Sequence, residues 1–175
     1  DAMIACLGTN KNDTLDILNK KYGHLCNPQD FLSRASELFH KLEFEEGIAL
    51  MPYAKECLEY LKPKYRIALA SSTRNELVIR QLKNANVLEF FEVIVTGDMV
   101  LHSKPDPEIY LKACEELNIP PENCIAIEDS PNGLKSAFFA GLNTIMVPDK
   151  IQPNEELNQF IWKKCDSLKN VMDML

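Results

Sequence analysis

Two adjacent carboxylates, Glu128 and Asp129, are the residues of this chain best suited to chemistry. They follow a short apolar run, residues 124–127, which predicts a strand buried on both faces of a parallel sheet. Ser130 suits the N-cap of a helix and Pro131 its first position, so the pair lies between a strand and a helix, where open α/β sheets bind ligands. Adjacent carboxylates favour a hard cation such as Mg²⁺. The alternative interpretation is a solvated acidic turn before a helix.

Two further polar sets follow predicted strands. Ser71, Ser72 and Thr73 come directly after the apolar residues 66–70, and they offer hydroxyls and helix-terminal amides to an anion. Lys104 lies in the stretch HSKPDPEIY, where prolines stiffen the backbone around a charge suited to a phosphate. Helix capping and an ordinary surface lysine are the respective alternatives. Three such sets, each after a strand, favour one site for a metal and a phosphate.

Composition excludes several classes of function. The chain has 175 residues, of which 46% are hydrophobic, enough for one domain with a small satellite. A formal charge of −7 argues against nucleic acid or an anionic membrane as the main partner. The six cysteines form no C-x-x-C pair, which predicts reduced thiols in a cytoplasmic protein. No apolar segment reaches the roughly 20 residues needed to span a bilayer.

The chain divides into two parts. Residues 1–46 carry helical patterns and no strand signal. Residues 47–175 alternate strands and helices with short connections, which predicts an α/β fold with a Rossmann-like parallel sheet. The predicted strands are residues 66–70, 93–95, 124–127 and 144–147, and helices are expected at 76–84 and 109–117. In the tail, Trp162 is expected to anchor short helices on the edge of the sheet.

Three stretches resemble motifs of one known family. LASSTRNE, HSKPDPEIYLKA and AIEDSPNGLKSAFFAG are similar, in this order, to the second, third and fourth motifs of the haloacid dehalogenase-like (HAD) hydrolases. The nearest subgroup has an α-helical cap and includes β-phosphoglucomutases and small phosphatases. The resemblance covers essentially the whole chain. It implies a HAD-like α/β core over residues 47–175 and a small, partial all-α cap over residues 1–46.

The resemblance also implies roles for individual residues. Ser71 and Ser72 would bind the transferring phosphoryl group, through a hydroxyl and an amide. Lys104 would neutralise that group and the nucleophile, and it is the expected catalytic residue within the chain. Glu128 and Asp129 would hold Mg²⁺, the expected cofactor.

Three further residues are tentative substrate contacts. Arg74 and Asn75 occupy positions near which some members of the family contact substrate. Lys11 lies in the cap turn where β-phosphoglucomutases carry an arginine for a substrate phosphate. Lysine keeps the charge of arginine but not its bidentate fork, which weakens the mutase interpretation.

The first motif of the family, D-x-D-G-T/V, is absent from the sequence. That motif supplies the aspartate nucleophile, on a strand that lies between the counterparts of residues 66–70 and 124–127. We therefore expect a gap in the sheet where this first core strand is missing, a missing N-terminal segment, and no activity of the 175 residues alone.

The expected function of the full-length protein is hydrolysis of a small phosphorylated metabolite by a Mg²⁺-dependent phosphomonoester hydrolase, through an aspartyl-phosphate. The alternatives are a phosphosugar mutase similar to β-phosphoglucomutase and a non-catalytic remnant that binds phosphate or metal. The motifs specify neither the substrate nor the oligomeric state.

Overall fold

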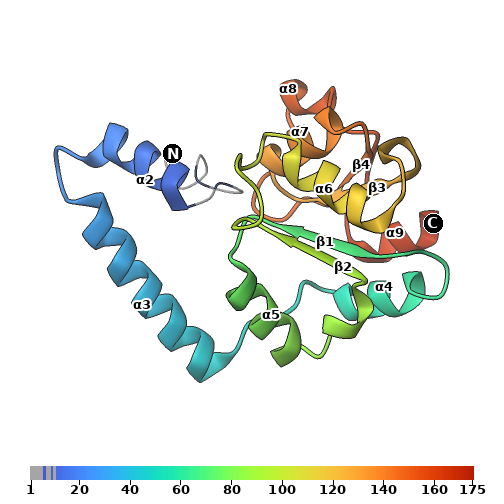
Figure 1. Cartoon of the computed structure of the whole chain (residues 1–175), viewed down its shortest axis with the longest axis horizontal. Coiled ribbons are helices and arrows are strands. Elements are labelled where there is room, and N and C mark those ends of the chain that lie inside the picture. Colours follow the sequence, from blue (N-terminus) through green and yellow to red (C-terminus); the bar gives the residue numbers. More distant parts are fainter. Residues whose placement is uncertain (1–5, 7–8, 10) are drawn as a thin grey trace.

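Two helices make up most of the N-terminal part of the chain that the structure describes. The computed structural model describes residues 6, 9 and 11–175. Helix α2 spans Lys11–Tyr22 and helix α3 spans Pro28–Glu46. Asn27 caps α3, because its side chain accepts a hydrogen bond from the backbone N–H of Gln29, and Pro28 occupies the first turn. Both helices lie to one side of the rest of the molecule, and α3 runs back toward α5, where Arg80 pairs with Glu43 (Figure 1).

Strands and helices alternate through the remainder of the chain, which confirms the predicted α/β class. In chain order these elements are α4 (Ala54–Leu61), β1 (Ala68–Ser71), α5 (Asn75–Asn84), β2 (Val93–Thr96), α6 (Glu108–Leu117), β3 (Ile125–Glu128), α7 (Pro131–Phe139), β4 (Asn143–Met146), α8 (Glu155–Asn158), β5 (Lys163–Lys164) and α9 (Leu168–Met174). Short 3₁₀ turns at Leu88–Phe90 and Pro121–Asn123 precede β2 and β3.

The strands form two parallel sheets. One contains β1 and β2, with Ala68 opposite Val93, and the other has the order β3-β4-β5, with Ile125 opposite Asn143. Among the strands of the described residues, none pairs with both β1 and β3. The division between the sheets therefore lies between the two strands where the sequence predicts a gap.

Packed helices hold the two sheets together. Helix α6 lies across β1 and β2, and its Ile109 and Ala113 share one buried cluster with Val95 of β2 and Ala126 of β3. A second cluster joins α4 and α9 to β4, around Ile145, which is fully buried. Burial of one such aliphatic side chain stabilises a fold by about 1.5–3 kcal/mol. Side-chain packing thus fixes the relative position of strands that are not hydrogen-bonded to each other.

The tail is anchored differently from the prediction. The side chain of Trp162 is 49% exposed, so its indole ring is not the anchor. Its backbone N–H instead donates to the carbonyl of Thr144 at 2.9 Å, while Phe160 and Leu157 supply the buried side chains. None of the helices in the described part of the chain combines the length and the apolar character needed to cross a bilayer.

Candidate active site

Ser71 and Ser72 lie at the carboxyl end of β1. Ser71 is the last residue of the strand, and its hydroxyl accepts a hydrogen bond from the backbone N–H of Thr73 at 3.2 Å. Both serines are half-buried. The chain at the end of β2 passes very close to this turn, since a Cβ on Gly97 would lie 2.2 Å from the carbonyl oxygen of Ser72. The position of Ser72 therefore depends on a glycine in the neighbouring strand connection.

Lys104 connects the three polar sets. Its side chain is only 7% exposed, so the alternative interpretation as an ordinary surface lysine is wrong. The ammonium donates to the carbonyl of Ala70 at 3.2 Å and to Oε1 of Glu128 at 2.5 Å. The ammonium also lies 4.9 Å from the centre of the Tyr110 ring. Residues at the ends of β1 and β3 thus contact the same buried ammonium group.

The carboxylate of Glu128 is held at the N-terminus of α7. Ser130 caps this helix by accepting from the backbone N–H of Gly133 at 3.1 Å, and its hydroxyl lies 3.2 Å from Oε2 of Glu128. A Cβ on Gly133 would lie 2.0 Å from that same oxygen, so only glycine leaves room for the carboxylate. The Tyr110 hydroxyl donates to Oε1, and burial, followed by the charge of Glu128, raises the pKa of Tyr110 well above its ordinary value.

Asp129 is the carboxylate that Lys104 compensates least. The residue is exposed, yet partial desolvation of its carboxyl group raises its pKa, and the charge of Glu128 raises it further. Lys104 lowers this pKa by the smallest contribution. A divalent cation would remove the electrostatic cost of two neighbouring carboxylates, and their hard oxygen donors suit Mg²⁺. Glu128 and Asp129 therefore fit the metal that the sequence predicts.

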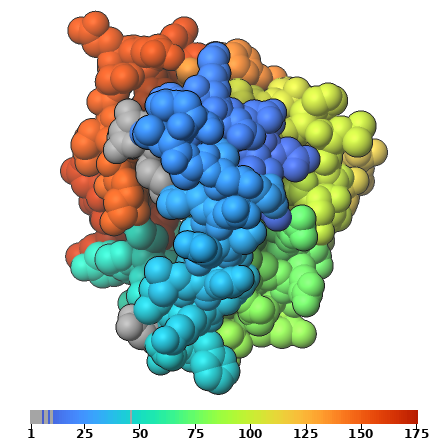
Figure 2. Space-filling view, turned by 90° about the vertical axis from the view of Figure 1, so that its left-hand side faces the viewer, coloured from blue at the N-terminus to red at the C-terminus, as the bar shows by residue number. Residues whose placement is uncertain are grey.

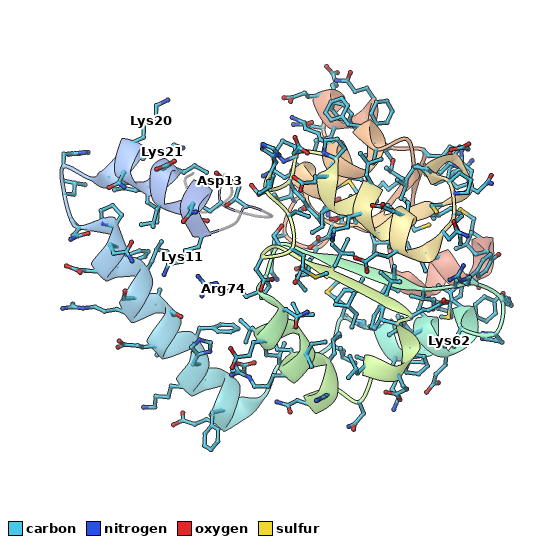
Figure 3. The ribbon with its side chains drawn as sticks, viewed as in Figure 1. Lys11, Asp13, Lys20, Lys21, Lys62 and Arg74 are labelled. Carbon is cyan, nitrogen blue, oxygen red and sulfur yellow. The ribbon has the colours of Figure 1, made fainter. Side chains whose placement is uncertain are left out.

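The tentative substrate residues divide between the two parts of the chain. Lys11 opens α2 and Arg74 precedes α5, and both are exposed. In Figure 3 their side chains extend into the space between the N-terminal helices and the α/β part. Asn75 is engaged through its backbone, because its N–H donates to Oδ1 of Asp98 at 3.0 Å. A hydrogen bond from the Thr96 hydroxyl, 2.6 Å long, is the main reason that the pKa of Asp98 is lowered.

A cavity of about 780 Å³ separates α2 from the α/β part and reaches Lys104. Its walls include Asp13 and Ile17 of α2, together with Asn132 and Phe139 of α7. Asp13 accepts a hydrogen bond from the Ser103 hydroxyl, which ties α2 to the loop after β2. Figure 2 shows the blue residues of α2 against this yellow-green loop. The arrangement provides an open cavity for a small molecule beside the buried lysine.

His102, Asp106 and Glu108 form a separate cluster in that loop. One ligand atom from each lies within 4.8 Å of the others. However, the Glu108 carboxylate already accepts the backbone N–H groups of Leu101 and His102, each at 2.8 Å, and these bonds lower its pKa. We therefore interpret the cluster as support for the loop that carries Lys104.

Sequence reasoning missed Tyr110 and Gly133. Tyr110 lies at helical spacing within an apolar stripe of α6, which ordinarily indicates a core residue. Its hydroxyl contacts both Glu128 and Lys104, and no local pattern predicts those partners. The sequence does carry one indication of the role of Gly133. A glycine three residues after an N-cap destabilises the helix, so its presence indicates a packing or functional constraint at that position.

Comparisons with known proteins found a matching family and several similar proteins. The family described as haloacid dehalogenase-like hydrolase matches residues 1–147. The phosphorylated carbohydrates phosphatase of Thermotoga maritima is 35% identical over 140 residues, which are 79% of this chain and 64% of that protein. The protein CbbY of Cereibacter sphaeroides is 39% identical over 125 residues, 69% of this chain and 54% of that protein.

Solved structures match over nearly the whole chain. CbbY from Rhodobacter sphaeroides in complex with phosphate superposes with a TM-score of 0.80 at 29% identity, covering 97% of this chain and 78% of that one. A putative β-phosphoglucomutase from Thermotoga maritima gives a TM-score of 0.74 at 28% identity, covering 97% of this chain and 79% of that one. The chain spans less than two thirds of the length of the curated relatives described above.

Proposed function

Because this chain belongs to the haloacid dehalogenase-like hydrolase family, we propose that it forms most of a Mg²⁺-dependent phosphomonoesterase for small phosphorylated metabolites. The observation that carries the proposal is the position of Lys104. Its ammonium contacts Ala70, next to Ser71 at the end of β1, and Glu128 at the end of β3. A buried cation between hydroxyl groups and a carboxylate pair is suited to a phosphoryl group.

In this proposal each residue acts on a separate part of the phosphoryl group. The Ser71 hydroxyl and the Ser72 amide bind its oxygens, and Lys104 offsets their negative charge. Glu128 and Asp129 hold Mg²⁺, which supplies further charge neutralisation when it is bound. Tyr110 acts as a positioning residue, since its hydroxyl contacts both Lys104 and Glu128.

The proposed reaction is two-step phosphoryl transfer through an aspartyl-phosphate. We place the aspartate nucleophile outside these 175 residues. Its carboxylate oxygen forms a bond to phosphorus while the ester P–O bond breaks and the alcohol leaves, and water then cleaves the acyl-phosphate. The open cavity between α2 and the α/β part would admit the small substrate. All six cysteines have free thiols, and free thiols are typical of cytoplasmic proteins because the cytosol keeps them reduced, which supports a cytoplasmic location.

The names of several relatives favour a sugar phosphate as substrate. One is named a phosphorylated carbohydrates phosphatase, and a solved CbbY structure contains xylulose-1,5-bisphosphate. A phosphosugar mutase is the second candidate, because solved structures titled β-phosphoglucomutase cover 97% of this chain. Lys11 and Arg74 would contact the distal part of either substrate. A mutase would isomerise a hexose 1-phosphate and lose this activity in Lys11→Ala.

The proposal is tested by aryl phosphate hydrolysis in two proteins. One is the 175-residue chain, and the other is a chimera that carries the N-terminal segment of the Thermotoga maritima phosphatase before residue 1. We expect turnover in the chimera only, with loss of turnover in EDTA and in Asp129→Asn. Turnover by the chain alone would place the nucleophile within it. A folded chimera without phosphatase or mutase activity would favour a non-catalytic remnant that binds phosphate or metal.

A further inference from the structure

An exposed aromatic side chain, Phe139, lies on the wall of the open cavity that reaches Lys104. Phe139 is the last residue of α7, and 57% of its surface is exposed. Leu101, in the loop after β2, lines the same cavity and is also largely exposed. The chemistry proposed at Lys104 uses neither of these side chains. Two apolar groups in the cavity wall thus have no assigned role.

Two neighbouring rings fix the orientation of the Phe139 ring. Its centroid lies 5.6 Å from that of Phe160 and 5.8 Å from that of Phe138, and the interplanar angles are 68° and 74°. Both pairs have the edge-to-face geometry that aromatic rings prefer. Phe160 is buried, so it anchors the three rings in the core. Phe139 therefore presents an ordered ring to the cavity, and a ligand could pack on it with little loss of side-chain entropy.

Helix α7 places this ring two turns away from the candidate phosphate site. The N-cap of the helix, Ser130, lies 3.2 Å from the Glu128 carboxylate, so the helix begins at that site. Asn132 and Phe139 are seven residues apart on one face of the helix, and both line the cavity. At a rise of ~1.5 Å per residue, about 10 Å separates them along the helix. A phosphoryl group at Lys104 and a group on Phe139 would therefore belong to opposite ends of one ligand.

The charges in the cavity wall disfavour a second anion beside Phe139. Among the described residues, the charged or titratable side chains that line the cavity with Lys104 are Asp13, His102 and Asp106. His102 lies 3.0 Å from the carboxylate of Glu108, which is its own ion-pair partner. The two aspartates would repel a second phosphate or a carboxylate, and like charges that face each other in a binding site weaken binding. The group that packs on Phe139 is therefore not an anion.

We propose that Phe139 is a specificity-determining residue that stacks a planar heteroaromatic ring in the alcohol part of the substrate. The inference rests on the proposed function, which places the phosphoryl group at Lys104. The substrate class is then a sugar phosphate that carries a base, that is, a mononucleotide. A flat ring suits this position, because the cavity is open and stacking on an aromatic side chain needs contact with only one face. A flexible alkyl chain would lose rotamer freedom there without being enclosed.

The test compares adenosine 5′-monophosphate with ribose 5-phosphate in calorimetric titrations of the 175-residue chain with Mg²⁺. We expect the mononucleotide to bind about tenfold more tightly, which is within the range for stacking of one base on an aromatic side chain. Phe139→Ala should remove this difference and leave the affinity for ribose 5-phosphate unchanged. Phe139→Tyr keeps a ring and should retain the difference. Equal affinities in the parent, or a difference that persists in Phe139→Ala, would overturn the inference.

A control variant and a spectroscopic readout separate stacking from a structural role. Phe44→Ala is the matched control, because Phe44 is 92% exposed on α3 and does not line the cavity, and it should change neither affinity. The adenine proton resonances should shift upfield on binding to the parent and to Phe139→Tyr, but not to Phe139→Ala. A dimer in sedimentation that requires Phe139 and excludes the mononucleotide would assign the ring to a second copy and overturn the inference.

Titration of adenosine, which has no phosphate, distinguishes failure of this inference from failure of the proposed function. If ribose 5-phosphate binds as tightly as the mononucleotide, the ring site is refuted and the phosphate site stands. If adenosine binds as tightly as the mononucleotide and Phe139→Ala weakens both, stacking is supported and the phosphoryl site at Lys104 is refuted. Binding of none of the three ligands would contradict both proposals.

Discussion

Removal of the Lys104 charge should destabilise the protein strongly. In Lys104→Met the ammonium is lost, while the Glu128 carboxylate stays in a site where the two side chains are only 7% and 9% exposed. Loss of one partner of a buried ion pair costs about 3–5 kcal/mol, because the other charge is left without compensation. Small proteins have a total stability of about 5–15 kcal/mol, so this loss is a large fraction.

The assay is urea denaturation followed by circular dichroism. Lys112→Met is the matched control, because Lys112 pairs with Glu116 at 3.8 Å on the surface of α6 and both side chains are more than a third exposed. We expect that control to change the free energy of unfolding by at most about 0.5 kcal/mol. The double variant Lys104→Met/Glu128→Gln should lose less free energy of unfolding than the two single variants lose together, by about 1–3 kcal/mol. A loss in Lys104→Met no larger than in Lys112→Met would refute the buried pair.

Three more predictions concern the surroundings of that pair. Gly133→Ala should lower the free energy of unfolding by about 1–3 kcal/mol, because the added Cβ would overlap the Glu128 carboxylate. The control Lys135→Ala, on the same helix, should lower it much less in the same urea assay. The pKa of Asp98 is lower in the folded protein than in the unfolded chain, so its ionised form stabilises the fold. This stabilisation is complete above the pKa of the unfolded chain, ~3.9, and is lost as the pH falls through the pKa of the folded protein. The difference in unfolding free energy between the parent and Asp98→Asn should therefore shrink from pH 6 to pH 3, and a constant difference would contradict this cause. Asp129→Asn should raise the melting temperature in EDTA at pH 7, because the raised pKa of Asp129 marks an ionised form that folding disfavours. Mg²⁺ should then stabilise the parent in a thermal melt but not this variant, and equal stabilisation would exclude Asp129 as a ligand.

Local sequence patterns were sufficient for the order of the elements up to β4 and for the position of the polar sets, but they did not predict β5. Ser130 and Pro131 predict the start of α7, and the structure confirms both the cap and the first residue of the helix. The short apolar runs predict the positions of β3 and β4, but the expected burial of both faces is wrong for β3, because its Ile125 and Ile127 are 38% and 37% exposed. The carboxyl ends of such strands carry the candidate site residues.

Local sequence patterns do not predict contacts between segments that are distant in the chain. The burial of Lys104 depends on Tyr110 six residues later and on Glu128 twenty-four residues later, and neither partner is encoded by spacing. Trp162 is predicted to anchor the tail, yet the tail uses the backbone of this residue to extend the sheet and leaves its side chain 49% exposed. Helix α2 begins at Lys11, and its Asp13 side chain contacts Ser103, a partner ninety residues away that no local pattern predicts.

Calorimetric titration of inorganic phosphate tests most directly whether the three polar sets form one Mg²⁺-dependent phosphate site. We predict saturable binding to the 175-residue chain that requires Mg²⁺. Ser71→Ala and Asp129→Asn should each weaken it about tenfold, the equivalent of ~1.4 kcal/mol for one charge-assisted contact. Lys112→Met should have no effect. Phosphate affinity that is independent of Mg²⁺, or unchanged in both site variants, would contradict the account.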